Sequence, residues 1–206
     1  MNEEYDKLIK EDVSLRKDCD FCKESILGVG QKSGYGVIIY KIGSSIKDGW
    51  FATLSPRTGG NPEEDFTIQL MPFAHLTHFS QVNAYPELAK NYGIAFSRIS
   101  SAITYVMAQN KDMKAIADSR ETGMPLAIYG KCTTWEEKKE HLHLKMFPFR
   151  GAIGQPSTVD GSFGRKEIHR DVKTGEEFVK MNPVRKENLT NERFNELSNL
   201  LISLLK

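Results

Sequence analysis

The segment EHLHLKMF at 140–147 constrains the fold of this chain more than any other stretch. Successive side chains of a β-strand point to opposite faces of a sheet, so alternate residues share a face. One face of a strand here would carry His141, His143 and Lys145. The other face would be apolar and would pack into a core: Leu142, Leu144 and Met146. The pattern therefore predicts a half-buried strand that presents two imidazoles and an ammonium group in a row.

Other short runs also have the composition of strands. They are rich in β-branched or aromatic residues, are bounded by turn residues, and lie at 36–42, 49–54, 65–71 and 125–130. Short turn-like links between the first three runs favour an antiparallel meander. Apolar residues at spacings of three and four predict a long helix over 86–109 and a second helix from Thr190.

These elements predict an α+β fold, in which a mostly antiparallel sheet carries one long helix. Residues 1–18 are polar and form an N-terminal arm, and 19–150 form the central domain. Residues 151–206 form a loop-rich tail that ends in the second helix, because the glycines between 150 and 175 favour loop over regular structure. The segment SPRTGGNPEED around Arg57 is typical of a surface turn, although it could contact a phosphate.

The spacing Cys19-x-x-Cys22 is typical of a metal-binding knuckle or of a redox pair. A redox pair requires a βαβ context, which is not predicted here, so the spacing favours a metal. A tetrahedral structural zinc needs two more nitrogen or sulfur ligands. The candidates are His75, His78, His141, His143, His169 and Cys132. His75 and His78 directly follow the third strand, and sequence spacing does not choose between them.

In its order of motifs the chain resembles the histidine triad (HIT) superfamily. This superfamily includes dinucleoside polyphosphate hydrolases, nucleoside phosphoramidases and galactose-1-phosphate uridylyltransferases. The order is CDFC, then MPFAH after a strand, then a long helix, then HLHLKMF. The resemblance covers roughly residues 19–148 and implies an HIT-like fold with a nucleotide or dinucleoside polyphosphate as substrate.

The resemblance also implies a role for each motif residue. It implies a zinc ion bound by Cys19, Cys22, His75 and His141. It implies that His143 attacks the α-phosphorus of a nucleotide and forms a covalent nucleotidyl-histidine intermediate, which water or another acceptor then resolves. The implied activity is a nucleotidyl hydrolase or nucleotidyltransferase. Imidazole suits this role because its pKa near ~6.5 leaves it largely neutral, and hence nucleophilic, at cytoplasmic pH.

The chain departs from the family pattern at Lys145, which stands at the position of the third histidine. A lysine could bind phosphate as a point charge, and a nearby cation favours the neutral form of His143. We therefore predict His143 and Lys145 as catalytic residues and Arg150 as a phosphate contact. Two expected features are also missing. The segment TTWEEKKE at 133–140 replaces a phosphate-binding stretch, and FATLSP at 51–56 lacks an acidic residue for ribose.

Two alternatives belong to other functional classes. The first is a nucleotide-binding protein without turnover, and the second is a zinc-stabilised interaction domain. With 28 basic and 27 acidic side chains the net charge is +1, which gives no strong signal for nucleic acid. No apolar run approaches the ~20 residues of a membrane span, and no signal-peptide core is evident, so we expect a cytoplasmic protein. The resemblance implies a homodimer that pairs along the helix at 86–109.

Overall fold

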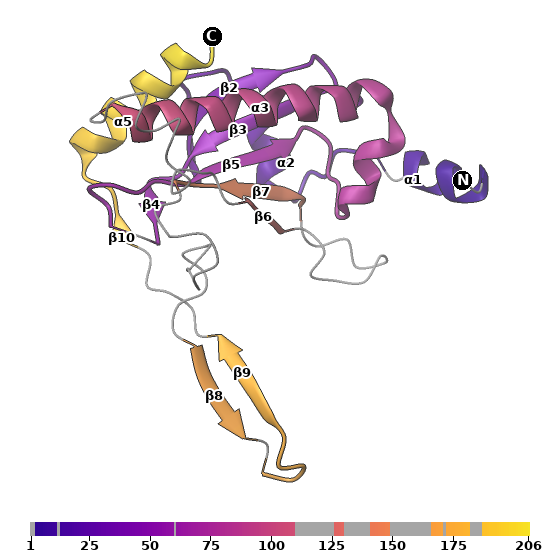
Figure 1. Cartoon of the computed structure of the whole chain (residues 1–206). Helices are drawn as coiled ribbons and strands as arrows, with labels where there is room; N and C mark the ends of the chain where they lie inside the picture. The colour runs from indigo at the N-terminus through magenta and orange to yellow at the C-terminus, as the bar shows by residue number, and fades with distance from the viewer. Residues whose placement is uncertain are drawn as a thin grey trace.

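An antiparallel sheet forms the centre of the computed structural model (Figure 1). The structure describes residues 3–11, 13–59, 61–109, 126–129, 141–148, 166–170, 172–181 and 187–206. In spatial order the strands of the sheet are β1 (Lys32–Ser33), β2 (Gly36–Ile42), β3 (Trp50–Leu54), β5 (Ile68–Pro72), β7 (His143–Met146) and β6 (Leu126–Tyr129). Each neighbouring pair is antiparallel. The predicted meander is formed by β2, β3 and β5.

The helices that the structure describes are α1 (Glu3–Glu11), α2 (Asp20–Glu24), the 3-10 helix η1 (Phe79–Ala84), α3 (Pro86–Ala108) and α5 (Asn191–Leu204). Two of them, α3 and α5, lie where apolar spacing predicts them, and the three shorter ones are not predicted in this way. The long helix α3 begins at Pro86, whose fixed φ suits the first helical position. Thr190 caps α5, since its side-chain oxygen accepts a hydrogen bond from the backbone N–H of Arg193 at 3.2 Å. The predicted α+β class is confirmed.

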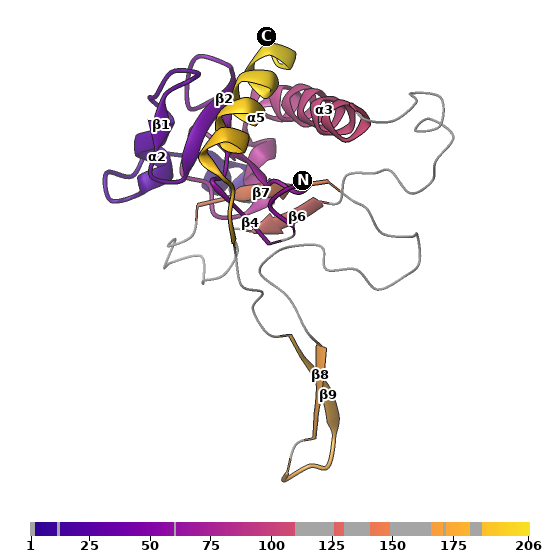
Figure 2. The same cartoon turned by 90° about the vertical axis from the view of Figure 1, so that its left-hand side faces the viewer.

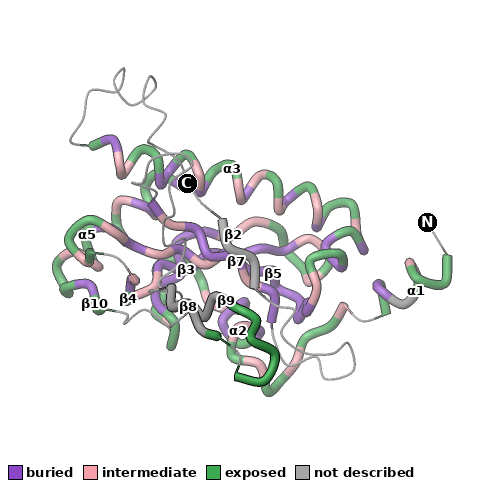
Figure 3. Tube along the Cα trace, turned by 60° about the horizontal axis from the view of Figure 1, so that its bottom comes forward, coloured by how far each residue is buried: buried purple, intermediate pink, exposed green. Residues whose placement is uncertain are grey.

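The main core lies between the sheet and the helices α3 and α5, which cover the same face (Figure 2). Buried positions recur along α3 as one stripe, as Figure 3 shows in purple. Trp50 packs in this core, and its indole N–H donates a hydrogen bond to the carbonyl of Leu88 at 2.9 Å. Leu142, Leu144 and Met146 belong to the same core, as their alternation in the sequence predicts.

The described C-terminal residues pack onto the central domain. Leu197, Leu201 and Leu205 contribute to the main core, and α5 lies against β2. Before α5, the short strand β10 (Glu187–Asn188) pairs with β4 (Arg57–Thr58). The end of the chain therefore contacts both the core and the loop that follows β3.

We expect Leu201→Ala to lower the free energy of unfolding by about 2–5 kcal/mol, because it opens a cavity in a site that is fully buried. Leu204→Ala is the matched control on the same helix, since Leu204 is 37% exposed, and it should cost less than about 1 kcal/mol. Urea unfolding of both variants measures the difference. Equal effects would contradict the packing of α5 described above.

The opposite face of the sheet holds a second, smaller apolar cluster of Ile38, Phe51, Met71 and Phe73. Phe21 and Leu27 from the segment around α2 pack against it. Polar residues lie beside this cluster, because Thr53, Gln69 and Lys145 are in register across β3, β5 and β7. The face opposite α3 therefore carries the polar residues of the sheet.

The tail also contains a hairpin that the glycine-rich pattern of 150–175 does not predict. Strand β8 (Lys166–Arg170) pairs in antiparallel fashion with β9 (Glu177–Met181), at the bottom of Figure 1. Gly175 adopts a φ of 75° in the connecting turn, a left-handed conformation that glycine tolerates best. Within the described ranges no helix is long and apolar enough to cross a membrane.

Candidate functional site

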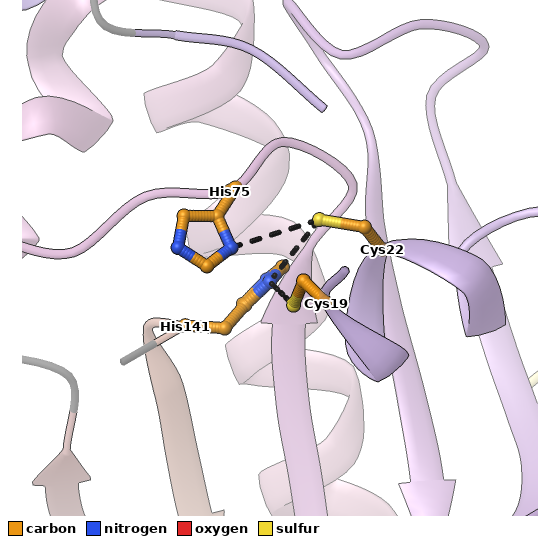
Figure 4. Close-up of side chains that lie close together, drawn as sticks. All are labelled: Cys19, Cys22, His75 and His141. Atoms are coloured by element: carbon orange, nitrogen blue, oxygen red, sulfur yellow. Dashed lines mark hydrogen bonds between the residues drawn. The ribbon is translucent and has the colours of Figure 1, made fainter. Parts of the chain in front are cut away.

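Two cysteines and two histidines converge at one end of the sheet (Figure 4). Cys19 and Cys22 lie at the start of α2, His75 follows β5, and His141 precedes β7. Because β5 and β7 are antiparallel neighbours, the end of one strand adjoins the start of the other. The backbone N–H of Leu142 donates to the carbonyl of Leu76 at 2.6 Å, which joins the two histidine segments.

The ligand atoms of these four residues all lie within 4.8 Å of one another, so the cluster is a possible metal-binding site. His141 Nδ1 lies 3.4 Å from Cys19 Sγ and 3.6 Å from Cys22 Sγ, and His75 Nδ1 lies 3.7 Å from Cys22 Sγ. Cys22, His75 and His141 are buried, and Cys19 is half-buried. Three segments that are far apart in the sequence thus bring two cysteines and two histidines together in one small volume.

The second nitrogen of His141 supports this arrangement. Its Nε2–H donates a hydrogen bond to the carbonyl of Pro72 at 3.1 Å. In a neutral ring this leaves the lone pair on Nδ1, the nitrogen that faces the sulfurs. Histidines that bind metals are commonly oriented by a hydrogen bond of this kind.

The two thiols share their protons unequally. The hydrogen bond with Cys22 lowers the pKa of the Cys19 thiol, and hydrogen bonds with His141 and His75 lower it further. The same hydrogen bond, together with burial, raises the pKa of Cys22. Cys19 is therefore the thiol of the pair that loses its proton more readily, and the thiolate is the form that binds metals.

His143 follows His141 by two residues and faces a cavity outside the cysteine–histidine cluster. It is half-buried and lines a cavity of about 510 Å³ on the sheet face opposite α3. Its Nδ1–H donates a hydrogen bond to the carbonyl of His141 at 2.9 Å. Lys145 lines the same cavity and is 7% exposed. The two residues predicted as catalytic therefore share one cavity, and His141 does not line it.

Phe21, which lies between the two cysteines, connects the cysteine–histidine cluster with the cavity. Its ring centroid is 5.5 Å from that of His141, 5.6 Å from that of His143 and 4.6 Å from that of Tyr35. Phe21 and Tyr35 both line the cavity. The knuckle thus supplies an aromatic wall beside His143.

The other residues predicted from sequence have different positions. His78 is not in the cluster, because its Nδ1 lies 2.8 Å from Thr77 Oγ1 at the start of η1. His169 lies in β8. Cys132, Arg150 and the segment 133–140 lie outside the described residues.

Sequence reasoning missed part of the cavity. Gln69 lines it, and the buried Oε1 of Gln69 accepts no hydrogen bond from the residues that the structure describes. The alternation of β5 could have placed Gln69 on the polar face. Arg57, whose segment is typical of a surface turn but could contact a phosphate, also lines the cavity.

Comparison of the chain with protein-family models, with curated proteins and with solved structures finds no match. A function for this chain is therefore argued from the residues above and from their geometry.

Proposed function

We propose that this chain is a zinc-containing enzyme of the histidine triad type, a nucleotidyl hydrolase or nucleotidyltransferase that uses His143 as its nucleophile. One observation carries the proposal. His143 faces a cavity that also contains a buried lysine, and it lies next to a cluster of two cysteines and two histidines. The resemblance to the histidine triad superfamily implies the same separation between a metal-binding His141 and a nucleophilic His143.

The distances in the cluster fit zinc. In a tetrahedral site with Zn–S of ~2.3 Å and Zn–N of ~2.0 Å, sulfur and nitrogen ligands lie about 3.5 Å apart. Three of the four sulfur–nitrogen distances are 3.4, 3.6 and 3.7 Å, and all the ligand atoms lie within 4.8 Å of one another. A zinc ion bound by Cys19, Cys22, His75 and His141 would have a complete ligand set. Such a closed site supplies structural order and leaves the reaction to other residues.

The tautomer of His143 suits nucleophilic attack. Since Nδ1–H donates to a backbone carbonyl, the neutral ring carries its lone pair on Nε2. In the proposed first step, Nε2 forms a bond to the α-phosphorus and the bond from phosphorus to the leaving oxygen breaks. In the second step, a hydroxyl oxygen of water or another acceptor bonds to phosphorus, the phosphorus–nitrogen bond breaks, and the acceptor loses its proton.

Lys145 would stabilise the charge on the phosphate oxygens during both steps. Phosphoryl transfer depends mainly on positioning and on electrostatic stabilisation, and a cation acts more strongly in a site that excludes water. Lys145 is buried and pairs in register with Gln69, so it is held at the floor of the cavity.

A second candidate function is nucleotide binding without turnover. The substitution of lysine for the third histidine favours it, because an ammonium ion retains phosphate but is a poor acid for releasing a leaving group.

We also propose a homodimer that pairs along α3, where Tyr105 is 47% exposed. Sedimentation of the purified chain tests the dimer.

A trapped intermediate separates the two candidates. We expect incubation with a panel of nucleoside polyphosphates and nucleotide sugars, followed by rapid denaturation at alkaline pH, to yield a peptide in which His143 carries one nucleotidyl group. Peptide mass spectrometry detects the adduct. Stabilisation of the fold by nucleotides without any adduct or product would favour binding alone.

A further inference from the structure

The C-terminal segment supports two residues of the cavity wall, Pro56 and Arg57. Arg57 pairs in register with Asn188, and the backbone N–H of Leu189 donates to the carbonyl of Pro56 at 2.9 Å. The hydroxyl of Ser55 accepts from the backbone N–H of Arg57 at 3.1 Å and donates to its carbonyl at 2.9 Å. The backbone of Arg57 is therefore fixed from both sides.

The side chain of Arg57 is oriented as well. Its Nε–H donates a hydrogen bond to Asn188 Oδ1 at 3.2 Å. A guanidinium group is planar, so fixing Nε also fixes the plane of the terminal nitrogens, which carry four more N–H donors. This is the geometry that binds two oxygens of a phosphate or carboxylate at once. Asn188 therefore acts on the cavity through Arg57.

The charges of the cavity point to an anionic ligand. Arg57, His143 and Lys145 line it, and none of the described lining residues is acidic. The volume of about 510 Å³ lies within the range of ~300–1,000 Å³ that is usual for small-molecule sites.

Arg57 and Lys145 lie on different parts of the sheet. Lys145 pairs with Gln69, and Gln69 pairs with Thr53, so β7 lies two strands away from β3. Two strand spacings amount to roughly 10 Å, and Arg57 follows the end of β3. The two cations therefore enter the cavity from separate strands, which lets them contact different anionic groups of one ligand.

We propose that Arg57, positioned by Asn188, forms a second anion subsite in the cavity and selects ligands with two linked anionic groups. The inference rests on the proposed function for its first subsite, at His143 and Lys145. It specifies a nucleoside diphosphate moiety, free or as part of a larger nucleotide, as the preferred ligand over a nucleoside monophosphate.

Calorimetric titration of the full-length chain tests this subsite. The probes are a nucleoside diphosphate, the corresponding monophosphate, inorganic pyrophosphate and inorganic phosphate. We expect Arg57→Ala to weaken binding of the diphosphate and of pyrophosphate by roughly 10-fold to 100-fold, as for a lost charge-assisted hydrogen bond. Binding of the monophosphate and of phosphate should change by less than about 3-fold, which also shows that the fold is intact.

The positioning role of Asn188 has its own prediction. Asn188→Ala should lower the preference for diphosphate over monophosphate in the same direction as Arg57→Ala, but by a smaller factor of about 3 to 10. Arg170→Ala is the control for a general loss of positive charge, because Arg170 is exposed and lies in the hairpin β8–β9. It should leave the preference unchanged.

The outcomes separate this inference from the proposed function. An equal loss of affinity for diphosphate and monophosphate in Arg57→Ala overturns the second subsite, as does a wild-type chain that binds neither pyrophosphate nor a nucleoside diphosphate. A preference that depends on Arg57, in a protein that never forms an adduct on His143, supports the subsite and contradicts the proposed catalysis.

Discussion

The variant Cys22→Ser is expected to lose the proposed zinc ion and to unfold at least about 10 °C below the wild type. Cys22 Sγ lies within 3.7 Å of Nδ1 of both His75 and His141. Because Cys22 is buried, a water molecule cannot take the place of the lost sulfur ligand. Binding of a structural metal stabilises the folded state directly, and about 4 kcal/mol corresponds to roughly 10 °C in a chain of this size. Elemental mass spectrometry and calorimetry measure the two effects.

A pair of histidine variants sharpens this test. His75→Asn should reduce the metal content to the level of Cys22→Ser, whereas His78→Asn should retain one equivalent, because His78 contacts Thr77 and lies outside the cluster. Zinc content that stays at one equivalent in both Cys22→Ser and His75→Asn would disprove the assigned ligands. A different metal in the purified wild type would disprove the identity of the metal as zinc but not the set of ligands.

The second large effect concerns His143, the proposed nucleophile. His143→Asn is expected to reduce turnover of the best nucleotide by at least about 1,000-fold and to eliminate the covalent adduct, because an amide nitrogen has no available lone pair for phosphorus. The amide N–H of asparagine can still donate to the carbonyl of His141, so the strand should keep its structure. Metal content and Tm should match the wild type.

Two further variants provide the controls for His143. His78→Asn should retain full activity, since it changes a histidine outside the cavity. Lys145→Gln should lower turnover by a smaller factor, about 10-fold to 100-fold, because it removes a charge that stabilises the transition state and leaves the nucleophile in place. Activity of His143→Asn within about 10-fold of the wild type would end the proposed mechanism.

Much of the fold can be predicted from local pattern. The alternation in HLHLKM predicts which residues of β7 enter the core, and the three-and-four spacing predicts α3 to within one residue at its C-terminal end. These signals are local, because a half-buried strand or helix must repeat its apolar residues with its own period. The hairpin of β8 and β9 lacks such a repeat, and the glycines around it mask the signal.

The candidate site is less accessible to sequence reasoning. The Cys-x-x-Cys spacing predicts a knuckle, but the choice of His75 over His78 depends on how the chain turns after Pro72, which sequence spacing does not specify. The contact between Arg57 and Asn188 joins residues 131 positions apart, through two short strands with no composition of their own. Contacts of this range are set by the packing of α5 and not by any local motif.

The aromatic ring of Phe21 bears on the order in which this protein matures. Phe21 lies in α2 between the two cysteines, and its ring contacts the rings of His143 and Tyr35. Without the proposed zinc ion, the sheet would still form, but the aromatic wall of the cavity beside His143 would not be held in place. Newly synthesised molecules would then bind nucleotide only after they had bound zinc, so their activity would depend on the zinc available in the cell.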